Sequence, residues 1–85
     1  MEFKIACKGG ARTIEGKVIK LVPWLKTTIH KSINGWRISE YTTGTAFIPY
    51  QFTREEAKTM ALERANRIGR EKILSLLKSF EQINF

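Results

Sequence analysis

Cysteine, histidine and long apolar runs are scarce in this chain of 85 residues, and each scarcity argues against a class of protein. The single cysteine, Cys7, excludes an internal disulfide framework, a paired-cysteine zinc site and a CxxC redox motif, and it fits a reducing cytoplasm. The single histidine, His30, has neither a second histidine nor a nearby cysteine, so we expect no metal and no cofactor. No run approaches the ~18 apolar residues of a membrane span, and residues 1–5 lack the apolar stretch of a signal peptide, so we expect a cytoplasmic protein without a membrane partner.

The length allows a single domain, residues 1–85, whose small core leaves little room for a deep cleft. Paired carboxylates for acid–base work are poorly represented, because Glu55 and Glu56 are better explained as helix-capping residues. Ser39 and His30 lack the third group of a catalytic triad, and Gly9-Gly10 lacks the context of a phosphate-binding loop. We therefore expect a protein that is not an enzyme.

Positive charge is present in excess. The chain has 15 Lys and Arg and eight Asp and Glu, which gives a net charge of +7. Residues 1–38 hold eight basic and two acidic residues, whereas residues 39–85 hold seven and six, so most of the excess lies in the N-terminal half. A strongly basic small domain usually has an anionic partner, most often nucleic acid, although the same excess can simply keep a protein soluble.

Several segments have the pattern of β-strands. Phe3, Ile5 and Cys7 alternate with polar residues up to Gly9-Gly10, and residues 13–22 predict a second extended segment that ends at a bend at Pro23. The strongest β signal is a hairpin of residues 27–33 and 36–41 around Asn34-Gly35, the preferred two-residue turn, which pairs Ile33 with Trp36. Residues 45–48 predict a further strand that Pro49 ends, so that residues 26–48 form a three-stranded meander.

The predicted hairpin has one apolar and one polar face, because side chains alternate along a strand. Ile29, Ile33, Trp36 and Ile38 share the apolar face. The polar face, which we expect to be exposed, carries His30, Ser32, Arg37, Ser39 and Tyr41. Such a mixture of cation, hydroxyl and aromatic ring suits contacts to phosphates and bases, although a polar sheet face can also simply contact water.

A helix begins after Thr53, which can cap the free N–H groups while Glu56 bonds back. Its first apolar stripe consists of Ala57, Met60, Ala61, Ala65 and Ile68. Beyond Gly69, a second and rotated stripe consists of Ile73, Leu76, Leu77 and Phe80. One straight helix cannot bury both stripes on one sheet. The helix therefore either kinks or breaks near Gly69, or the second stripe faces another element, such as a second copy of the protein.

Three arginines recur along this helix at Arg64, Arg67 and Arg70. Glu63 lies four residues before Arg67, and Glu71 four residues after it, which predicts an exposed, salt-bridged helix face rather than a basic binding stripe. The fold class that emerges is α+β: a small N-terminal antiparallel sheet of three to five strands, packed against a C-terminal helix that starts at Thr53.

The run GWRISEYTTG at residues 35–44, followed by FTREEA at residues 52–57, resembles the strand–turn–strand–helix of many small phage and mobile-element proteins. In particular it is similar to the arm-type DNA-binding domain of tyrosine integrases, which has three strands and one helix. The resemblance covers about residues 27–68. It implies DNA binding through the sheet, with contacts from Arg37, Ser39 and Tyr41, and the cytoplasm of a host cell as the location.

Two functional hypotheses follow from these features. The first is a non-enzymatic accessory protein that binds nucleic acid, DNA rather than RNA, through the exposed face of its sheet. Its predicted contacts are Arg12, Lys17, Lys20, Lys26, His30, Lys31, Arg37, Ser39 and Tyr41. The second is a protein-binding inhibitor of a host nuclease or defence complex, similar to an anti-CRISPR protein. A third possibility is a homodimer built through Ile73, Leu76, Leu77 and Phe80.

Overall fold

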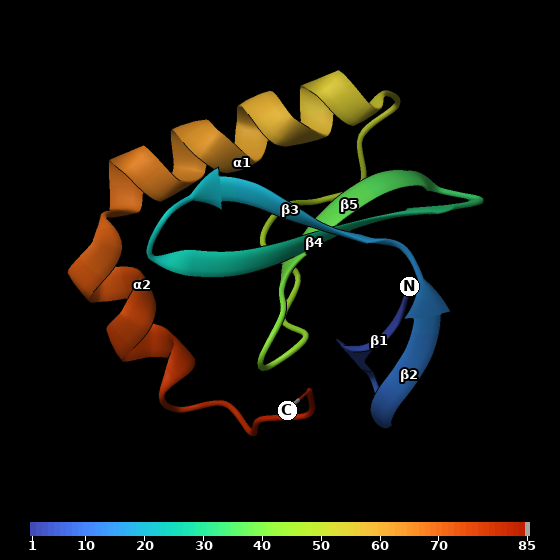
Figure 1. Cartoon of the computed structure of the whole chain (residues 1–85), viewed down its shortest axis with the longest axis horizontal. Coiled ribbons are helices and arrows are strands. Elements are labelled where there is room, and N and C mark those ends of the chain that lie inside the picture. Colours follow the sequence, from blue (N-terminus) through green and yellow to red (C-terminus); the bar gives the residue numbers. More distant parts are fainter. Residues whose placement is uncertain (85) are drawn as a thin grey trace.

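The computed structural model describes residues 1–84 and consists of two antiparallel sheets followed by two helices (Figure 1), which confirms the α+β class. One sheet pairs β1 with β2, and the other has the order β3-β4-β5. The elements are β1 (Glu2–Cys7), β2 (Gly10–Glu15), β3 (Lys17–Val22), β4 (Leu25–Ser32), β5 (Gly35–Glu40), α1 (Arg54–Ile68) and α2 (Arg70–Leu77).

The first sheet is a hairpin in which β1 and β2 pair from Glu2↔Glu15 to Cys7↔Gly10. The predicted strand at the N-terminus is confirmed, but the single extended segment over residues 13–22 is wrong, because Gly16 separates β2 from β3. A Cβ atom at Gly16 would lie 2.7 Å from Cζ of Phe3. A residue without a side chain is therefore needed where the chain passes from one sheet to the other.

The hairpin of β4 and β5 is confirmed, but its predicted register is wrong by two residues. Lys31, not Ile33, pairs with Trp36, and the turn residues are Ile33 and Asn34. Gly35 supplies the positive φ, 115°, from inside β5, and Asn34 donates its N–H to Oγ of Ser32 at 3.1 Å. Because side chains alternate with a period of two, this shift leaves the side chains within the two strands on their predicted faces, but Ile33 moves from the apolar face into the turn.

The predicted strand at residues 45–48 is not regular. This segment makes isolated bridges to β5, with Ala46 opposite Ser39 and Gln51 opposite Trp36. Pro49 has no N–H to donate, which interrupts the ladder. The third strand of the sheet is instead β3, which pairs with the other side of β4.

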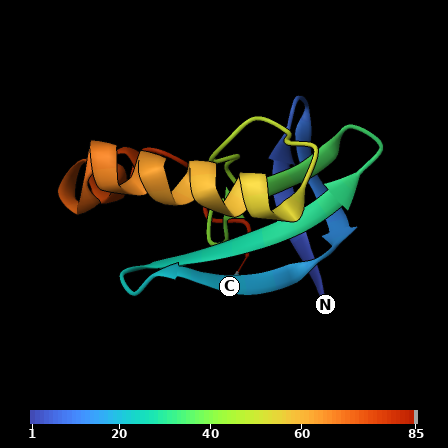
Figure 2. The same ribbon diagram turned by 90° about the horizontal axis from the view of Figure 1, so that it is seen from above.

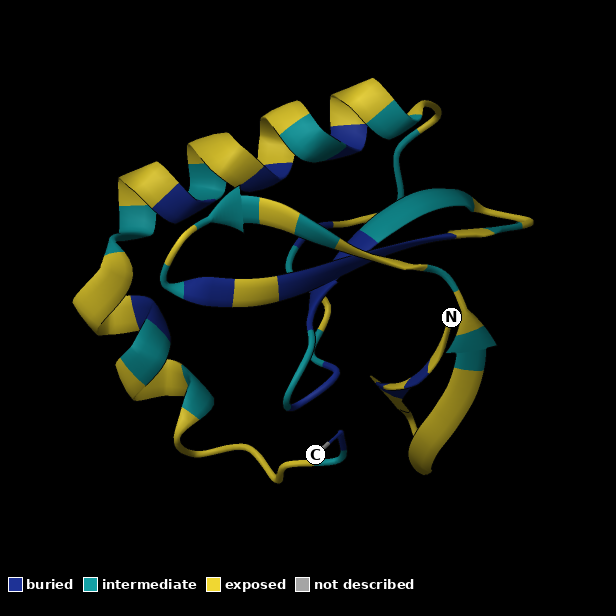
Figure 3. Cartoon of the chain, in the orientation of Figure 1, coloured by how far each residue is buried: buried dark blue, intermediate teal, exposed yellow. Residues whose placement is uncertain are grey.

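Helix α1 covers one face of the three-stranded sheet, here called the helix face (Figure 2). Ala57 and Ala61 are fully buried against Ile29, Ile38 and Ile48. Alanine side chains are small enough to let the helix approach the strands closely, whereas Met60, which was predicted to share their stripe, is exposed. Figure 3 shows this division along α1, with buried residues on its inner side and exposed residues on its outer side.

The helix breaks at Gly69, as predicted, with a φ of 91° that an L side chain rarely adopts. This break turns α2 away from the axis of α1 and toward the far end of the sheet (Figure 1). Ile73 is buried there with Leu25 and Ala65. Within residues 1–84, no helix is long and apolar enough to span a membrane.

The C-terminal segment returns to the N-terminal hairpin (Figure 1). The side chain of Asn84 donates to the carbonyl oxygens of Lys4 and Tyr41, at 2.7 and 2.6 Å, and accepts the N–H of Lys4 at 2.8 Å. The backbone N–H groups of Ile83 and Asn84 both bond to the carbonyl oxygen of Thr42. These bonds link both ends of the chain to the turn that follows β5.

Candidate nucleic-acid interface

The polar face of the β4–β5 hairpin is not exposed, contrary to the prediction. This face, here called the hairpin face, carries Thr28, His30, Arg37 and Ser39 on the side of the sheet opposite α1. Ser39 is 1% exposed and His30 is 3% exposed, whereas Arg37 is half-buried. Ile5, Arg12 and Ile14 of the β1–β2 hairpin line a hollow together with His30 and Tyr50. Ser39 and His30 are therefore not available for the surface contacts that the sequence predicted.

Three of the predicted contact residues lie toward the other end of the sheet or apart from the hairpin face. Lys26 is exposed, and its Nζ atom lies 3.8 Å from the centre of the half-buried Tyr41 ring. Tyr41 follows β5 and packs its ring near that of Phe3. Lys20 is exposed on β3, which contains a register irregularity between Ile19 and Val22. These residues do not form one patch with Arg12 and Lys31.

Four cations do gather where the β1–β2 hairpin meets the end of the three-stranded sheet. We call this set, Arg12, Lys17, Lys31 and Arg54, the basic end. Arg12 and Lys31 line a hollow of about 520 Å³, and Lys17, Lys31 and Arg54 line a second hollow of about 300 Å³. The two hollows share Glu15, His30 and Lys31, so they are neighbours.

Little negative charge offsets this cluster. Glu15 is the one carboxylate that lines either hollow, and it forms an ion pair with the N-terminal amine of Met1. No other ion pair occurs within residues 1–84. The side chains of the basic end therefore keep their positive charge available for an anionic partner.

Aromatic rings accompany the cations at this end. Nζ of Lys31 lies 5.6 Å from the ring centre of Trp36, and the guanidinium carbon of Arg37 lies 3.9 Å from that of Tyr50. The Tyr50 ring also meets the His30 ring edge-on, with 6.0 Å between the centroids. Such rings hold long cationic side chains in place by cation–π attraction.

His30 is placed among positive charges. It faces Arg37 directly across the β4–β5 pair, and Arg12 approaches from β2. Burial lowers the pKa of His30 below its ordinary value of 6.5, and the Arg37 and Arg12 guanidinium groups lower it further. The imidazole is therefore neutral in the folded protein at neutral pH.

Two large apolar side chains are also exposed near the basic end. Ile33, at the β4–β5 turn, is 100% exposed and lines the larger hollow. Phe52 is 93% exposed and directly follows Gln51, whose backbone pairs with Trp36. Large side chains exposed to this degree are available as apolar anchors for a partner.

The predicted oligomer stripe is divided by the fold. Ile73 is buried in the core, and the half-buried Leu77 packs against the same cluster. Leu76 and Phe80 are exposed. The break at Gly69 is the reason, since it lets α2 turn its apolar side onto the end of the sheet.

The arginines of α1 do not form the predicted salt bridges. Arg64 donates to the carbonyl oxygen of Phe47 at 3.2 Å, which ties the helix to the segment beside β5. Across the described chain, neither Glu63 nor Glu71 lies within 4.0 Å of a basic group. Gly69 interrupts the helix between Arg67 and Glu71, so the four-residue spacing no longer brings their side chains together.

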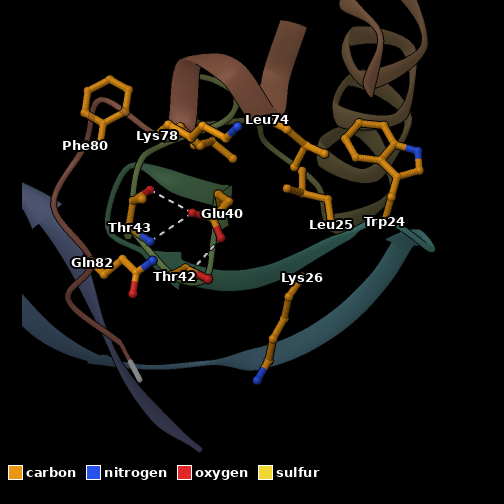
Figure 4. Close-up of a pocket in the computed structure, with 11 residues that line it drawn as sticks. Trp24, Leu25, Lys26, Glu40, Thr42, Thr43, Leu74, Lys78, Phe80 and Gln82 are labelled. Carbon is orange, nitrogen blue, oxygen red and sulfur yellow. Dashed lines mark hydrogen bonds between the residues drawn. The ribbon is translucent and has the colours of Figure 1, made fainter. Parts of the chain in front are cut away.

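A separate hollow of about 460 Å³ lies beneath α2 (Figure 4). Leu25, Trp24 and Leu74 form an apolar wall, and the buried Glu40 lies beside them. Both Glu40 oxygens already accept hydrogen bonds from the turn after β5: from the N–H of Thr42 at 2.6 Å, and from the N–H and hydroxyl of Thr43 at 2.8 Å each. Glu40 therefore holds this turn in place.

Sequence reasoning missed Arg54 and Tyr50. Arg54 was assigned to the capping region of the helix, and only the fold brings it beside Lys17 and Lys31. Tyr50 lies in an irregular segment that has no periodic pattern.

Among residues 1–84, no group of three or more His, Cys, Asp or Glu side chains is placed to hold a metal ion.

Comparisons of the chain with protein-family models, with curated proteins and with solved structures find no match.

Proposed function

We propose that this protein binds nucleic acid, with DNA favoured over RNA, and acts as a non-enzymatic accessory protein of a phage or mobile element. The observation that carries the proposal is the basic end, where Arg12, Lys17, Lys31 and Arg54 surround two neighbouring hollows. The single carboxylate among them, Glu15, is occupied by the N-terminal amine. Phosphate groups are the anions that such a cluster of cations fits best.

The proposed surface differs from the one that the sequence predicted. The surface contacts come from Arg12, Lys17 and Lys31 of the predicted set, with Arg54 added. The predicted residues left out as surface contacts are Lys20, Lys26, His30, Arg37, Ser39 and Tyr41. The resemblance to the arm-type domain of integrases supports DNA as the ligand and the cytoplasm of a host cell as the location. The contact surface in this proposal is the end of the sheet rather than its face.

Salt dependence gives the first test. Four phosphate contacts predict a slope of log K against log salt of about −3.6, so that affinity for duplex DNA falls roughly 150-fold between 50 and 200 mM salt. Fluorescence anisotropy with labelled duplex DNA, single-stranded DNA and RNA at both salt concentrations measures this slope. Absence of binding to all three at 50 mM salt would contradict the proposal.

A matched pair of variants tests the location. The double variant Arg12→Glu with Lys31→Glu reverses two charges of the basic end. The control, Arg67→Glu with Arg70→Glu, makes the same change of net charge on exposed positions of the helices. We expect the first variant to lose more than about tenfold in affinity and to flatten the salt slope by about 2. We expect the control to lose no more than about threefold, and equal losses in both variants would exclude a local site.

A second candidate function is inhibition of a nucleic-acid-binding protein complex, and the exposure of Ile33 and Phe52 favours it. A protein–protein interface with apolar anchors at its centre should stay bound at salt concentrations that release nucleic acid. If no nucleic acid binds, a nuclease complex that binds the protein at 200 mM salt, but not the double variant Ile33→Ser with Phe52→Ser, would support inhibition. Equal binding of that variant would exclude these anchors.

A further inference from the structure

The hairpin face contains three buried polar atoms that no protein group satisfies. Nδ1 of His30, Nε of Arg37 and Oγ of Ser39 have no hydrogen-bond partner in the part of the chain that the structure describes. His30 pairs with Arg37 across the two strands, and Ser39 occupies a neighbouring position on the same face. Buried polar atoms in native proteins nearly always have partners, so a cluster of three calls for an explanation.

These atoms belong to groups that donate hydrogen bonds. A guanidinium only donates, a hydroxyl can donate, and a neutral imidazole carries one N–H. Arg12 adds a second guanidinium, since it lines the 520 Å³ hollow together with His30 and Tyr50. Arg37 and Ser39 do not line this hollow, so a ligand in it would meet Arg12 and His30 directly, with the positive charge of Arg37 across the strand pair from His30.

The remaining groups around His30 leave the hollow with an excess of positive charge. Lys31 and Glu15 also line the hollow, and Glu15 is held by the N-terminal amine. Tyr50 places its ring against both His30 and Arg37. A cationic ligand would be repelled here, and an apolar ligand would leave the donors unsatisfied, whereas a phosphate accepts several hydrogen bonds and matches guanidinium geometry.

We propose that this hollow holds one phosphate of the bound nucleic acid, with Arg12 and Lys31 balancing its charge, and that His30 takes up a proton as the phosphate binds. The inference rests on the proposed function, because it takes nucleic acid as the source of the phosphate. In the free protein, burial and the two guanidinium groups keep the pKa of His30 low. The negative charge of a phosphate in the hollow opposes the effect of the guanidinium groups on His30, so binding and protonation favour each other reciprocally.

The first experiment compares DNA affinity at pH 5.5 and pH 7.5 for the wild type and His30→Asn, both at 50 mM salt. We expect the wild type to bind about fivefold more tightly at pH 5.5, and His30→Asn to change by less than twofold. Wild-type binding that is independent of pH, or that changes equally in the variant, would overturn this inference and leave the proposed function standing. Absence of wild-type binding at both pH values would overturn the proposed function itself.

The second experiment does not require a variant of a buried residue. His30 is the single histidine of the chain, so its imidazole resonance can be followed through a pH titration by NMR. The probes are a thymidine octamer with a 5′-phosphate, the same octamer without it, and inorganic phosphate, at constant ionic strength. We expect the octamers to raise the titration midpoint in the wild type, and to raise it less in Arg12→Gln, whose changed side chain is exposed.

The probes also identify the source of the phosphate. An equal rise with both octamers would assign the hollow to a backbone phosphodiester, and a larger rise with the 5′-phosphorylated octamer would assign it to a strand end. Either result supports the inference. A midpoint that no octamer changes would overturn it, including the case in which inorganic phosphate alone has an effect.

Discussion

Asn84 closes the fold by linking the C-terminal segment to β1 and to the turn after β5. Its side chain is buried and makes three hydrogen bonds of 2.6 to 2.8 Å with Lys4 and Tyr41. A hydrogen bond of this kind contributes about 1 kcal/mol net. In Asn84→Ala, the groups of the exposed Lys4 regain water, whereas the half-buried Tyr41 carbonyl is satisfied less well. We therefore expect the free energy of unfolding to fall by about 2 kcal/mol, and the melting temperature by roughly 10 °C.

A second substitution at this position separates hydrogen bonding from packing. Asn84→Asp keeps the shape of the side chain, but it places an oxygen where Nδ2 now donates to two carbonyl oxygens. If the hydrogen bonds stabilise the fold, Asn84→Asp should lower the free energy of unfolding at least as much as Asn84→Ala. Urea unfolding followed by circular dichroism gives both values, and the exposed Gln82→Ala, two residues away, is the control. A loss below about 0.5 kcal/mol for either variant of Asn84 would refute the reasoning.

Three further predictions concern the remaining fold. The folded protein holds His30 at a pKa below the unfolded value of about 6.5, so the unfolded chain binds the proton more readily. The contribution of His30 to stability should be fully present above that pH and should fall as the pH decreases below it. The urea midpoints at pH 7.5 and pH 5.0 should therefore differ less in His30→Gln than in the wild type. Ile73→Ala should lower the free energy of unfolding by about 2–4 kcal/mol, because Ile73 is buried. The exposed Leu76→Ser should change it by no more than about 0.5 kcal/mol and leave the mass in solution unchanged. A lower mass for Leu76→Ser than for the wild type would support a homodimer. Thr53→Ala should lose about 1 kcal/mol in thermal unfolding, because Oγ1 of Thr53 accepts the N–H of Glu56 at 3.1 Å, and an unchanged melting temperature would show that the cap contributes nothing.

Local signals predicted the elements whose causes lie within a few residues. Thr53 and Glu56 placed the start of α1 within a residue, because a capping box satisfies the free N–H groups of a helix locally. Gly69 placed the break, since its missing side chain permits the positive φ found there. The alternation along β4 and β5 assigned the side chains within these strands to their faces even though the register differed by two residues, and only Ile33, which lies in the turn, left its predicted face.

The sequence by itself therefore determined the α+β class, the hairpin of β4 and β5, the start and the break of the helix, and an unbalanced positive charge. Only the tertiary structure decided which polar face is buried, because that depends on where the β1–β2 hairpin packs, and no local pattern encodes a contact between residues so far apart. The same packing removed Ser39 and His30 from the surface and brought Arg12 beside Lys31. Arg54 joined them because the entry to α1 lies above the end of the sheet, a relation that depends on the path of the whole chain.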